Sequence, residues 1–349
     1  MKNIDKINLL EMDREALSHF ILEMGEKSFR ANQIWSWLYI KGASQFDEMT
    51  NLSKQFREKL NHVAEIRHLD LIKASDSNVS DTRKFLWRLE DGLKIESVFI
   101  PEEKRRTVCI SSQVGCTLAC GFCATGSMGF KRNLKMYEMV DQILSIRKKM
   151  DEPPTNIVVM GMGEPFLNYE NVIRALTLVN DKEGIAIGHR RITISTAGIV
   201  PAIIRYAVEG HPFKLAISLN ATTNAVRSRI MPINRKYPLE ALLKAAKTYT
   251  RKSRKRITFE YVLLHGVNDS MEDAARILSI LGDIPCKVNL IACNETQSGY
   301  KRPPDSHIEA FAEAIRPLCA PVTLRLSKGD DINGACGQLA AGAWESERN

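Results

Sequence analysis

The chain has 349 residues, of which 44% are hydrophobic and 26% charged, and its formal net charge is +8. This composition is typical of a folded globular protein and excludes intrinsic disorder. No apolar run approaches the roughly 18 residues of a membrane span, and the first residues are too charged for a signal peptide, so we expect a cytoplasmic protein. Eight cysteines in that compartment favour metal or thiol chemistry over a disulfide scaffold.

The first part of the chain is predicted to be helical. Between residues 9 and 65, apolar residues recur at helical spacing. From residue 69 to 112 the period changes to two, and Asp91-Gly92 separates two alternating runs, which indicates a β-hairpin. We therefore expect a helical accessory domain over residues 1–68, followed by a β-hairpin extension over residues 69–106.

Strands and helices alternate in the rest of the chain. Helical patterns lie between or beside five apolar, β-branched runs of strand length: "TNIVVMGMG", "HRRITISTAG", "FKLAISLN", "RITFEYVLLHG" and "CKVNLIACN". This alternation indicates parallel strands with active groups at their carboxyl ends. With "TVCISS" as the first strand there are about six β/α units, too few for an eightfold barrel, so residues 107–349 are predicted to form a partial (β/α)6 barrel. A doubly wound sheet is the other possibility, although no strand is followed by its GxGxxG loop.

A cysteine triplet marks the beginning of this α/β region. Cys116, Cys120 and Cys123 follow one another at spacings of four and three residues. Structural zinc sites usually have four ligands in two CxxC pairs, and the nearest histidine before the triplet is His68. Three thiolates suit a four-iron cluster that keeps one iron open for another ligand. We interpret the triplet as the ligands of a [4Fe-4S] cluster, with structural zinc or buried free thiols as the alternatives.

The CxxxCxxC spacing, with Phe122 just before the last cysteine, resembles the signature of the radical S-adenosylmethionine superfamily. The resemblance implies a radical SAM barrel in which the open iron binds the amino and carboxylate groups of S-adenosylmethionine, and one-electron reduction releases a 5′-deoxyadenosyl radical. The motif "GMGEP" fits this interpretation, because its glycines let the backbone approach the methionine part and Glu164 can meet the ammonium group. The predicted cofactor contacts are Gly163, Glu164, Ser195, Ser218, Leu219, Asn220 and Asn294.

Motifs over nearly the whole chain narrow the family. They are, in chain order, "FRANQIWSWLY", "KIESVFIP", "CISSQVGC", "CATGSMGFKRNL", "GMGEP", "MPIN", "HGVND" and "ACGQL". Together they resemble the RlmN family, the dual-specificity methyltransferases of ribosomal and transfer RNA. The resemblance implies methylation at C2 of adenosine, in the peptidyl transferase centre of 23S rRNA and in tRNA at the position 3′ of the anticodon, with two S-adenosylmethionine molecules per turnover.

Two further cysteines and a glutamate acquire roles from this resemblance. Adenine C2 is electrophilic, so ordinary polar attack on a methyl sulfonium fails there. The family mechanism implies that Cys336 accepts a methyl group, and that this group, once a radical has removed a hydrogen atom from it, bonds to C2. Cys109 would then form a disulfide with Cys336 and release the methylated base, and Glu96 would act as acid or base. Without the resemblance, the thiols would be interpreted as core cysteines and Glu96 as a solvated carboxylate.

The chain departs from the usual family pattern at a few positions. Asn220 stands where the family usually has His, and the other departures are Ala292, Cys293, Asn333 and Gly334. The contacts of Asn220 and the packing around Asn294 are therefore left open. The remaining cysteines, which we expect to be core thiols, are Cys286, Cys293 and Cys319.

The expected partners are ribosomal and transfer RNA and an electron donor such as flavodoxin, with no membrane contact and a monomeric chain. The net charge permits a polyanionic partner, and basic segments such as "RKSRKR" are candidates for phosphate contacts. Two alternatives remain: a C8-specific 23S rRNA adenine methyltransferase of the resistance type, and a zinc-stabilised RNA-binding protein without enzymatic activity. The proline of "GMGEP" and the N-terminal helices favour the C2 enzyme.

Overall fold

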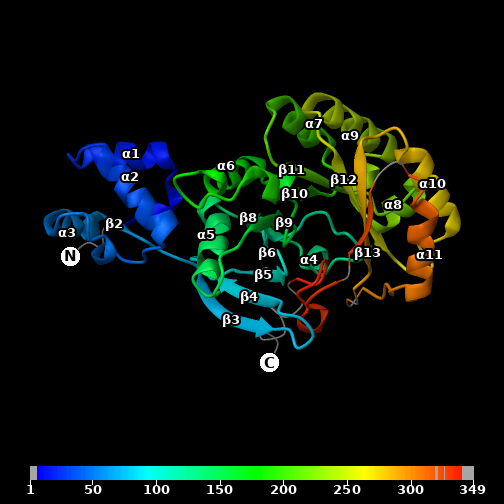
Figure 1. The fold of residues 1–349 in the computed structure, drawn as a ribbon, viewed down its shortest axis with the longest axis horizontal. Coiled ribbons are helices and arrows are strands. Elements are labelled where there is room, and N and C mark those ends of the chain that lie inside the picture. The colour runs from blue at the N-terminus through cyan, green and yellow to red at the C-terminus, as the bar shows by residue number, and fades with distance from the viewer. Residues whose placement is uncertain (1–5, 295, 297, 319–320, 326, 340–349) are drawn as a thin grey trace.

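The computed structural model describes residues 6–294, 296, 298–318, 321–325 and 327–339. Figure 1 shows a small group of N-terminal helices at one end of the molecule, beside a larger α/β body. In the described ranges, no helix combines the length and the apolar character that crossing a membrane requires.

The N-terminal region consists of three helices, and the starts of α1 and α3 are explained by capping side chains. Asp13 accepts a hydrogen bond from the backbone N–H of Ala16 (3.0 Å), and Ser53 accepts one from Phe56 (3.2 Å). The beginning and the end of this region meet where the short strand β1 pairs in parallel with β2. The elements are β1 (Ile7–Asn8), α1 (Arg14–Glu23), α2 (Phe29–Ser36), a π-helical turn (Trp37–Lys41), α3 (Lys54–Val63) and β2 (Ala64–Glu65).

The body is built on one continuous sheet of ten strands in the described residues. Its parallel part runs through seven neighbouring strands: β6 (Arg105–Ile110), β9 (Asn156–Val159), β10 (Ile192–Thr196), β11 (Lys214–Ser218), β12 (Ile257–Leu263), β13 (Cys286–Ala292) and β14 (Val322–Arg325). The connecting helices are α5 (Met136–Arg147), α6 (Tyr169–Asn180), α7 (Val200–Glu209), α8 (Asn224–Ile230), α9 (Leu239–Ser253), α10 (Met271–Leu281) and α11 (Asp305–Ile315). Six β/α units followed by an edge strand confirm the predicted partial barrel.

Three antiparallel strands extend this sheet beyond β6. They are β3 (Asp70–Asp76), β4 (Arg83–Arg88) and β5 (Lys94–Glu102), and β5 pairs directly with β6. The turn between β4 and β5 contains Gly92 at a φ of +81°, a conformation that favours glycine. The predicted hairpin is therefore present, but its strands are part of the barrel sheet. The domain boundaries at residues 68 and 106 remain predictions.

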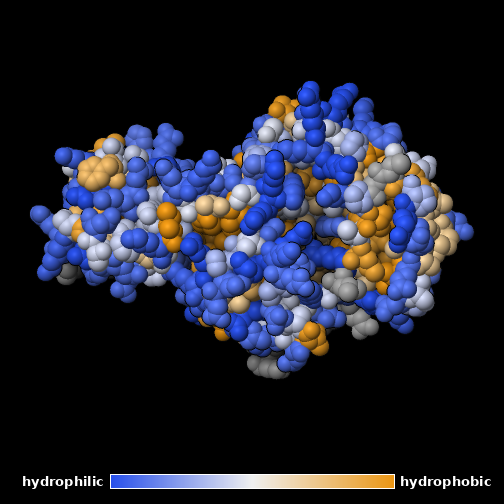
Figure 2. Space-filling model, viewed as in Figure 1, coloured by the Kyte–Doolittle hydropathy of each residue, from blue (hydrophilic) through white to orange (hydrophobic). Residues whose placement is uncertain are grey.

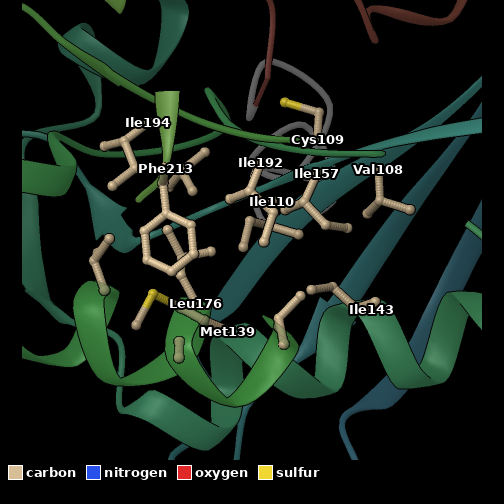
Figure 3. Packing of buried hydrophobic residues seen from close by; sticks show 14 of the residues in the cluster. Val108, Cys109, Ile110, Met139, Ile143, Ile157, Leu176, Ile192, Ile194 and Phe213 are labelled. Carbon is tan, nitrogen blue, oxygen red and sulfur yellow. The ribbon is translucent and has the colours of Figure 1, made fainter. Parts of the chain in front are cut away.

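The alternation of side chains along β6 places them on two sides of the sheet. Val108 and Ile110 point to the helical side, where Met139 and Ile143 of α5 pack against the strands (Figure 3). Cys109, between them, points to the opposite side. The outer face of the sheet thus forms the hydrophobic core under the helices, and the inner face is left for polar and reactive groups.

Candidate functional site

The three cysteines of the triplet lie on one loop between strand β7 (Gln113–Gly115) and helix α4 (Ala124–Ser127). Strand β7 pairs with β8 (Phe130–Asn133), and Gly115 makes the close approach possible. A Cβ atom on Gly115 would lie 1.8 Å from the carbonyl oxygen of Gly129, and its φ is +74°. Cys116 N–H then donates to the same carbonyl (3.0 Å), which fixes the start of the loop.

The thiols of this loop are partly buried and influence one another. Burial raises the pKa of Cys116 to about 12, and Cys123 acts in the same direction. Burial also raises the pKa of Cys120, and the charges of Cys123 and Cys116 raise it further. Three thiolates so close together need a cation, and a four-iron cluster supplies iron atoms to separate thiolates. The donor set of this loop fits a [4Fe-4S] cluster.

A single metal ion would need a different arrangement. Among the residues that the structure describes, no three His, Cys, Asp or Glu side chains converge closely enough to hold one ion. A tetrahedral zinc site requires all of its ligands at about 2.0–2.3 Å from one point, whereas the thiolates of a cluster bind separate irons.

Cys336 lies beside the cluster loop, on the segment that follows the short 3-10 turn Asp330–Ile332. Two backbone carbonyls of this segment accept hydrogen bonds: Gly337 O from the N–H of Ala124 (2.7 Å), and Cys336 O from the side-chain Nδ2 of Asn294 (2.9 Å). In addition, Thr125 Oγ1 donates to Leu339 O (3.0 Å). The predicted cofactor contact Asn294 therefore also positions the backbone of Cys336.

Cys109 and Cys336 lie within electrostatic range of each other. Burial raises the pKa of Cys109 to about 12, and the Cys336 thiolate is the next largest cause. Burial also raises the pKa of Cys336, although its side chain is solvent-accessible, and the guanidinium of Arg325 opposes that increase. Arg325 ends strand β14, and the Cys336 thiolate raises the pKa of its guanidinium. The sequence analysis did not identify Arg325.

Glu96 lies on the same inner face as Cys109, because the register of the sheet aligns the strands. Val98 of β5 pairs with both Cys109 of β6 and Lys84 of β4, and Glu96 is two residues before Val98. Glu96 is 1% exposed, so it is not a solvated carboxylate. Lys84 Nζ lies 2.9 Å from Glu96 Oε1 in a buried ion pair.

Lys84 also connects this ion pair to the loop of Cys336. Its Nζ donates to Asn333 O at 3.4 Å. The turn after β3 holds the same loop, since Ser77 Oγ and the N–H of Asn78 both donate to the Asp331 carboxylate at 2.8 Å. The antiparallel strands thus hold the loop of Cys336 over the inner face.

Glu164 joins the ends of two neighbouring strands. It is 2% exposed, and its two oxygens accept hydrogen bonds from Phe166 N–H (3.0 Å) and Ala197 N–H (2.7 Å). Burial raises its pKa to about 7. Gly163 beside it has a φ of +99°, and a Cβ there would lie 2.5 Å from Gln113 Cβ. Gly163 is therefore needed for the close approach of its backbone to Gln113. The approach of S-adenosylmethionine to this glycine remains a prediction.

The remaining predicted contacts lie at strand ends. Ser195 Oγ donates to Glu260 Oε2 (2.9 Å), while the other oxygen of Glu260 is buried without a partner in the described residues. The carbonyls of Ser218 and Leu219 accept hydrogen bonds from Arg227. Asn220 is buried, and its Oδ1 accepts from Val262 N–H (2.8 Å). Their contacts to S-adenosylmethionine remain predictions.

Several residues of the site were missed by sequence reasoning. Glu260 carried a usable signal, because it is a lone charge within the apolar strand "RITFEYVLLHG". Lys84 and Arg227 carried none, since a lysine in an alternating strand and an arginine in a helix are usually exposed. Of the remaining cysteines, Cys286 and Cys293 are buried as expected, and Cys319 lies outside the described residues.

Comparisons with known proteins agree with this geometry. Residues 7–66 match the family described as "Ribosomal RNA large subunit methyltransferase N-terminal domain", and residues 110–278 match the radical SAM superfamily. The chain is 46% identical over 334 residues to the dual-specificity RNA methyltransferase RlmN of Geobacter sulfurreducens, with 95% of this chain and 92% of that protein covered. It is 46% identical over 332 residues to the probable dual-specificity RNA methyltransferase RlmN of Thermotoga maritima, with 95% and 97% covered. A crystal structure of a radical SAM methyltransferase from Sphaerobacter thermophilus superposes with a TM-score of 0.92 at 40% identity, covering 96% of this chain and 99% of that chain.

Breaking the buried ion pair is expected to destabilise the protein. Lys84→Met leaves Glu96 charged and buried, which should cost about 3–5 kcal/mol in the free energy of unfolding. The double variant Lys84→Met/Glu96→Met should lose much less, because neither charge remains. Lys328→Met, which removes a more exposed lysine 3.7 Å from Glu102, should change stability by less than about 1 kcal/mol. Denaturant unfolding of the four proteins measures this, and equal stability of the single and double variants would contradict it.

The raised pKa of Glu164 predicts a pH dependence of stability. A folded-state value of about 7, above the ordinary 4.5, means that the folded protein holds this proton more tightly than the unfolded chain. The corresponding stability is present below pH 4.5 and is lost as the pH rises through 7. In cluster-free protein, raising the pH from about 5 to 8 should lower the free energy of unfolding by about 2–3 kcal/mol more in wild type than in Glu164→Gln. Parallel pH profiles of the two proteins would contradict the assignment.

Proposed function

The chain belongs to the RlmN family of radical S-adenosylmethionine RNA methyltransferases, and from this premise we propose that it methylates C2 of adenosine in 23S ribosomal RNA and in transfer RNA. In the ribosomal substrate the adenosine lies in the peptidyl transferase centre, and in transfer RNA it lies 3′ of the anticodon. The enzyme uses a [4Fe-4S] cluster and two molecules of S-adenosylmethionine per turnover.

One observation carries the proposal: two thiols from distant parts of the chain lie within electrostatic range of each other, and Cys336 lies beside the cluster loop. Cys109 comes from the first barrel strand and Cys336 from the C-terminal segment. The Cys336 thiolate raises the pKa of Cys109, and both thiolates raise the pKa of Arg325. A methyltransferase that simply moved a methyl group from a sulfonium to a nucleophilic atom would need neither thiol. A carbon as electrophilic as adenine C2 requires a carrier on the protein, and a second thiol can release it.

The residues of the chain divide this work. Cys336 is the methyl acceptor: Arg325 stabilises its thiolate, and the hydrogen bonds to its backbone fix its position next to the cluster loop. After the new carbon–carbon bond exists, the adduct radical would give up one electron, which the oxidised cluster can accept. Cys109 would then attack the sulfur of Cys336, so that the carbon–sulfur bond breaks and a Cys109–Cys336 disulfide forms. The electron pair of the broken bond stays with the carbon, which takes up a proton and becomes the methyl group of the released base. Glu96, buried on the same face, accepts the proton that leaves C2 of the base.

The cofactors are held at the carboxyl ends of the strands. Cys116, Cys120 and Cys123 would hold the cluster, and the strand ends around Glu164 and Ser195 would hold S-adenosylmethionine. When bound, this pair supplies reductive cleavage of the sulfonium and a radical able to remove a hydrogen atom. Figure 2 shows hydrophobic side chains in a hollow on this face of the α/β body, near β12 and β13. Such lining keeps water away from a reactive site.

RNA and an electron donor are the partners that this chemistry requires. The formal charge of +8 and the basic segment 251–256 support contacts with the phosphate backbone. The N-terminal helices carry RNA affinity in this proposal, a flavodoxin-type protein supplies electrons, and the chain acts as a monomer. Mass spectrometry of RNA from a strain that lacks other adenine methyltransferases, with the methyl position assigned, tests the reaction: methylation at C8 would replace the C2 assignment.

Removal of any cluster ligand is expected to abolish the cofactor. Cys116→Ala, Cys120→Ala and Cys123→Ala should each lose the visible absorbance of the cluster and all RNA methylation, because two thiolates cannot hold it. Cys286→Ala is the control, since this thiol is also buried but lies at the amino end of β13, whereas the cofactors are expected at the carboxyl ends of the strands. Iron analysis after anaerobic purification measures the result. A triplet variant with a full iron content and retained methylation would contradict the assignment of these cysteines as cluster ligands.

The two other thiols should fail in different ways. Cys336→Ala should keep its iron but form neither methylated RNA nor a covalent complex, because no carrier remains. Cys109→Ala should stall as a protein–RNA adduct that survives denaturation and maps to Cys336. A denaturing gel of each variant from cells, with and without ribonuclease, distinguishes them. Absence of an RNA-dependent band in Cys109→Ala would count against the mechanism, and full activity of Cys336→Ala would exclude it.

A further inference from the structure

One buried arginine near the cluster loop has only neutral partners. Arg227 lies on α8, and its side chain is completely buried, at 0% exposure. Its guanidinium donates to three backbone carbonyls, those of Ala197 (2.7 Å), Ser218 (3.0 Å) and Leu219 (3.0 Å), and to Asn234 Oδ1 (3.2 Å). These acceptors satisfy the hydrogen-bond donors of the guanidinium, but because they are neutral they do not balance its positive charge.

No carboxylate in the described part of the chain forms an ion pair with Arg227. Several other largely buried charges do have such partners, as Glu96 has Lys84 and Glu138 has Arg132. A buried charge without a counter-charge costs several kcal/mol, so a protein rarely keeps one without a reason. Burial lowers the pKa of Arg227 to about 10, so the side chain is still positively charged at neutral pH.

The cluster loop is a source of negative charge that acts on Arg227. The last residue of α8, Ile230, accepts a hydrogen bond from Gly121 N–H of that loop (2.9 Å). Cys120 packs against the small hydrophobic cluster that contains Ile230 and Met231. A thiolate at Cys120 acts electrostatically on Arg227. The helix that carries the unpaired cation therefore also contacts the loop that carries the cluster ligands.

We propose that Arg227 is the buried counter-charge of the iron–sulfur cluster and raises its reduction potential. This inference rests on the cofactor assignment above. An iron–sulfur cluster held by three thiolates has a net negative charge, which increases when it accepts an electron. A buried positive charge stabilises the reduced form more than the oxidised form, because electrostatic interactions are strong in a low-dielectric interior.

A purely structural role makes a different prediction. The four hydrogen bonds of Arg227 also tie the loop after β10 to the end of β11, so any substitution disturbs these strand ends. If only the hydrogen bonds mattered, Gln would replace Arg227 about as well as Lys would. If the charge matters, Lys should preserve the potential although its geometry is poorer, and Gln should not.

The experiment is a redox titration of the anaerobically reconstituted full-length enzyme, with the reduced cluster followed by electron paramagnetic resonance. Wild type is compared with Arg227→Lys, Arg227→Gln and Arg227→Met, after iron and sulfide have been counted in each. The matched control is Arg229→Met, which removes the same charge from an exposed position two residues along the same helix. Solvent and salt screen that charge, so its removal should leave the potential unchanged.

We expect Arg227→Met and Arg227→Gln to shift the potential to more negative values by at least about 59 mV, the equivalent of a tenfold change in a one-electron equilibrium. Arg227→Lys should stay closer to wild type. An unchanged potential in loaded Arg227→Met overturns the proposal. If Met prevents cluster loading, the Lys and Gln variants decide: identical potentials in these two contradict a role of charge. A wild-type protein without iron would instead contradict the cofactor assignment.

Discussion

The alternation of side chains along one continuous sheet is the constraint on which the site depends. Each strand sends every second side chain outward onto the helices, and the residues between them face inward. On β6 the outward residues Val108 and Ile110 are almost completely buried in the core, while Cys109 faces inward (Figure 3). The same alternation faces Glu96 and Lys84 inward on the antiparallel strands. A shift of one residue in the pairing would place these groups under the helices.

The C-terminal segment completes the inner face because hydrogen bonds hold its backbone. Ala124 and Asn294 bind the carbonyls of Gly337 and Cys336, and Asp331 binds the turn after β3. These contacts fix the path of the segment without using the side chain of Cys336. The thiol of Cys336 therefore stays accessible while its backbone is held, as the proposed role of methyl carrier requires.

Charges inside the barrel are arranged in two ways. Lys84 and Glu96 neutralise each other, so their site is stable without a ligand. Arg227 has only neutral partners, and one oxygen of Glu260 has none in the described residues. Uncompensated buried groups are expensive and are usually found where a ligand supplies the missing partner. Arg227 lies at the carboxyl ends of β10 and β11, where the cofactors of a radical SAM barrel are expected, and Glu260 lies in the middle of β12.

The sequence by itself determined the order of strands and helices, the cysteine triplet and the family, because periodicity and short motifs are local properties of the chain. Through the resemblance of whole motifs it also predicted roles for Cys109, Cys336 and Glu96. Only the tertiary structure showed that Glu96 is buried against Lys84, that Gly163 makes room for Gln113, and that Arg227 is buried without a counter-charge. Burial and pairing depend on the register between distant strands and on the path of the C-terminal segment, and neither leaves a local pattern in the sequence.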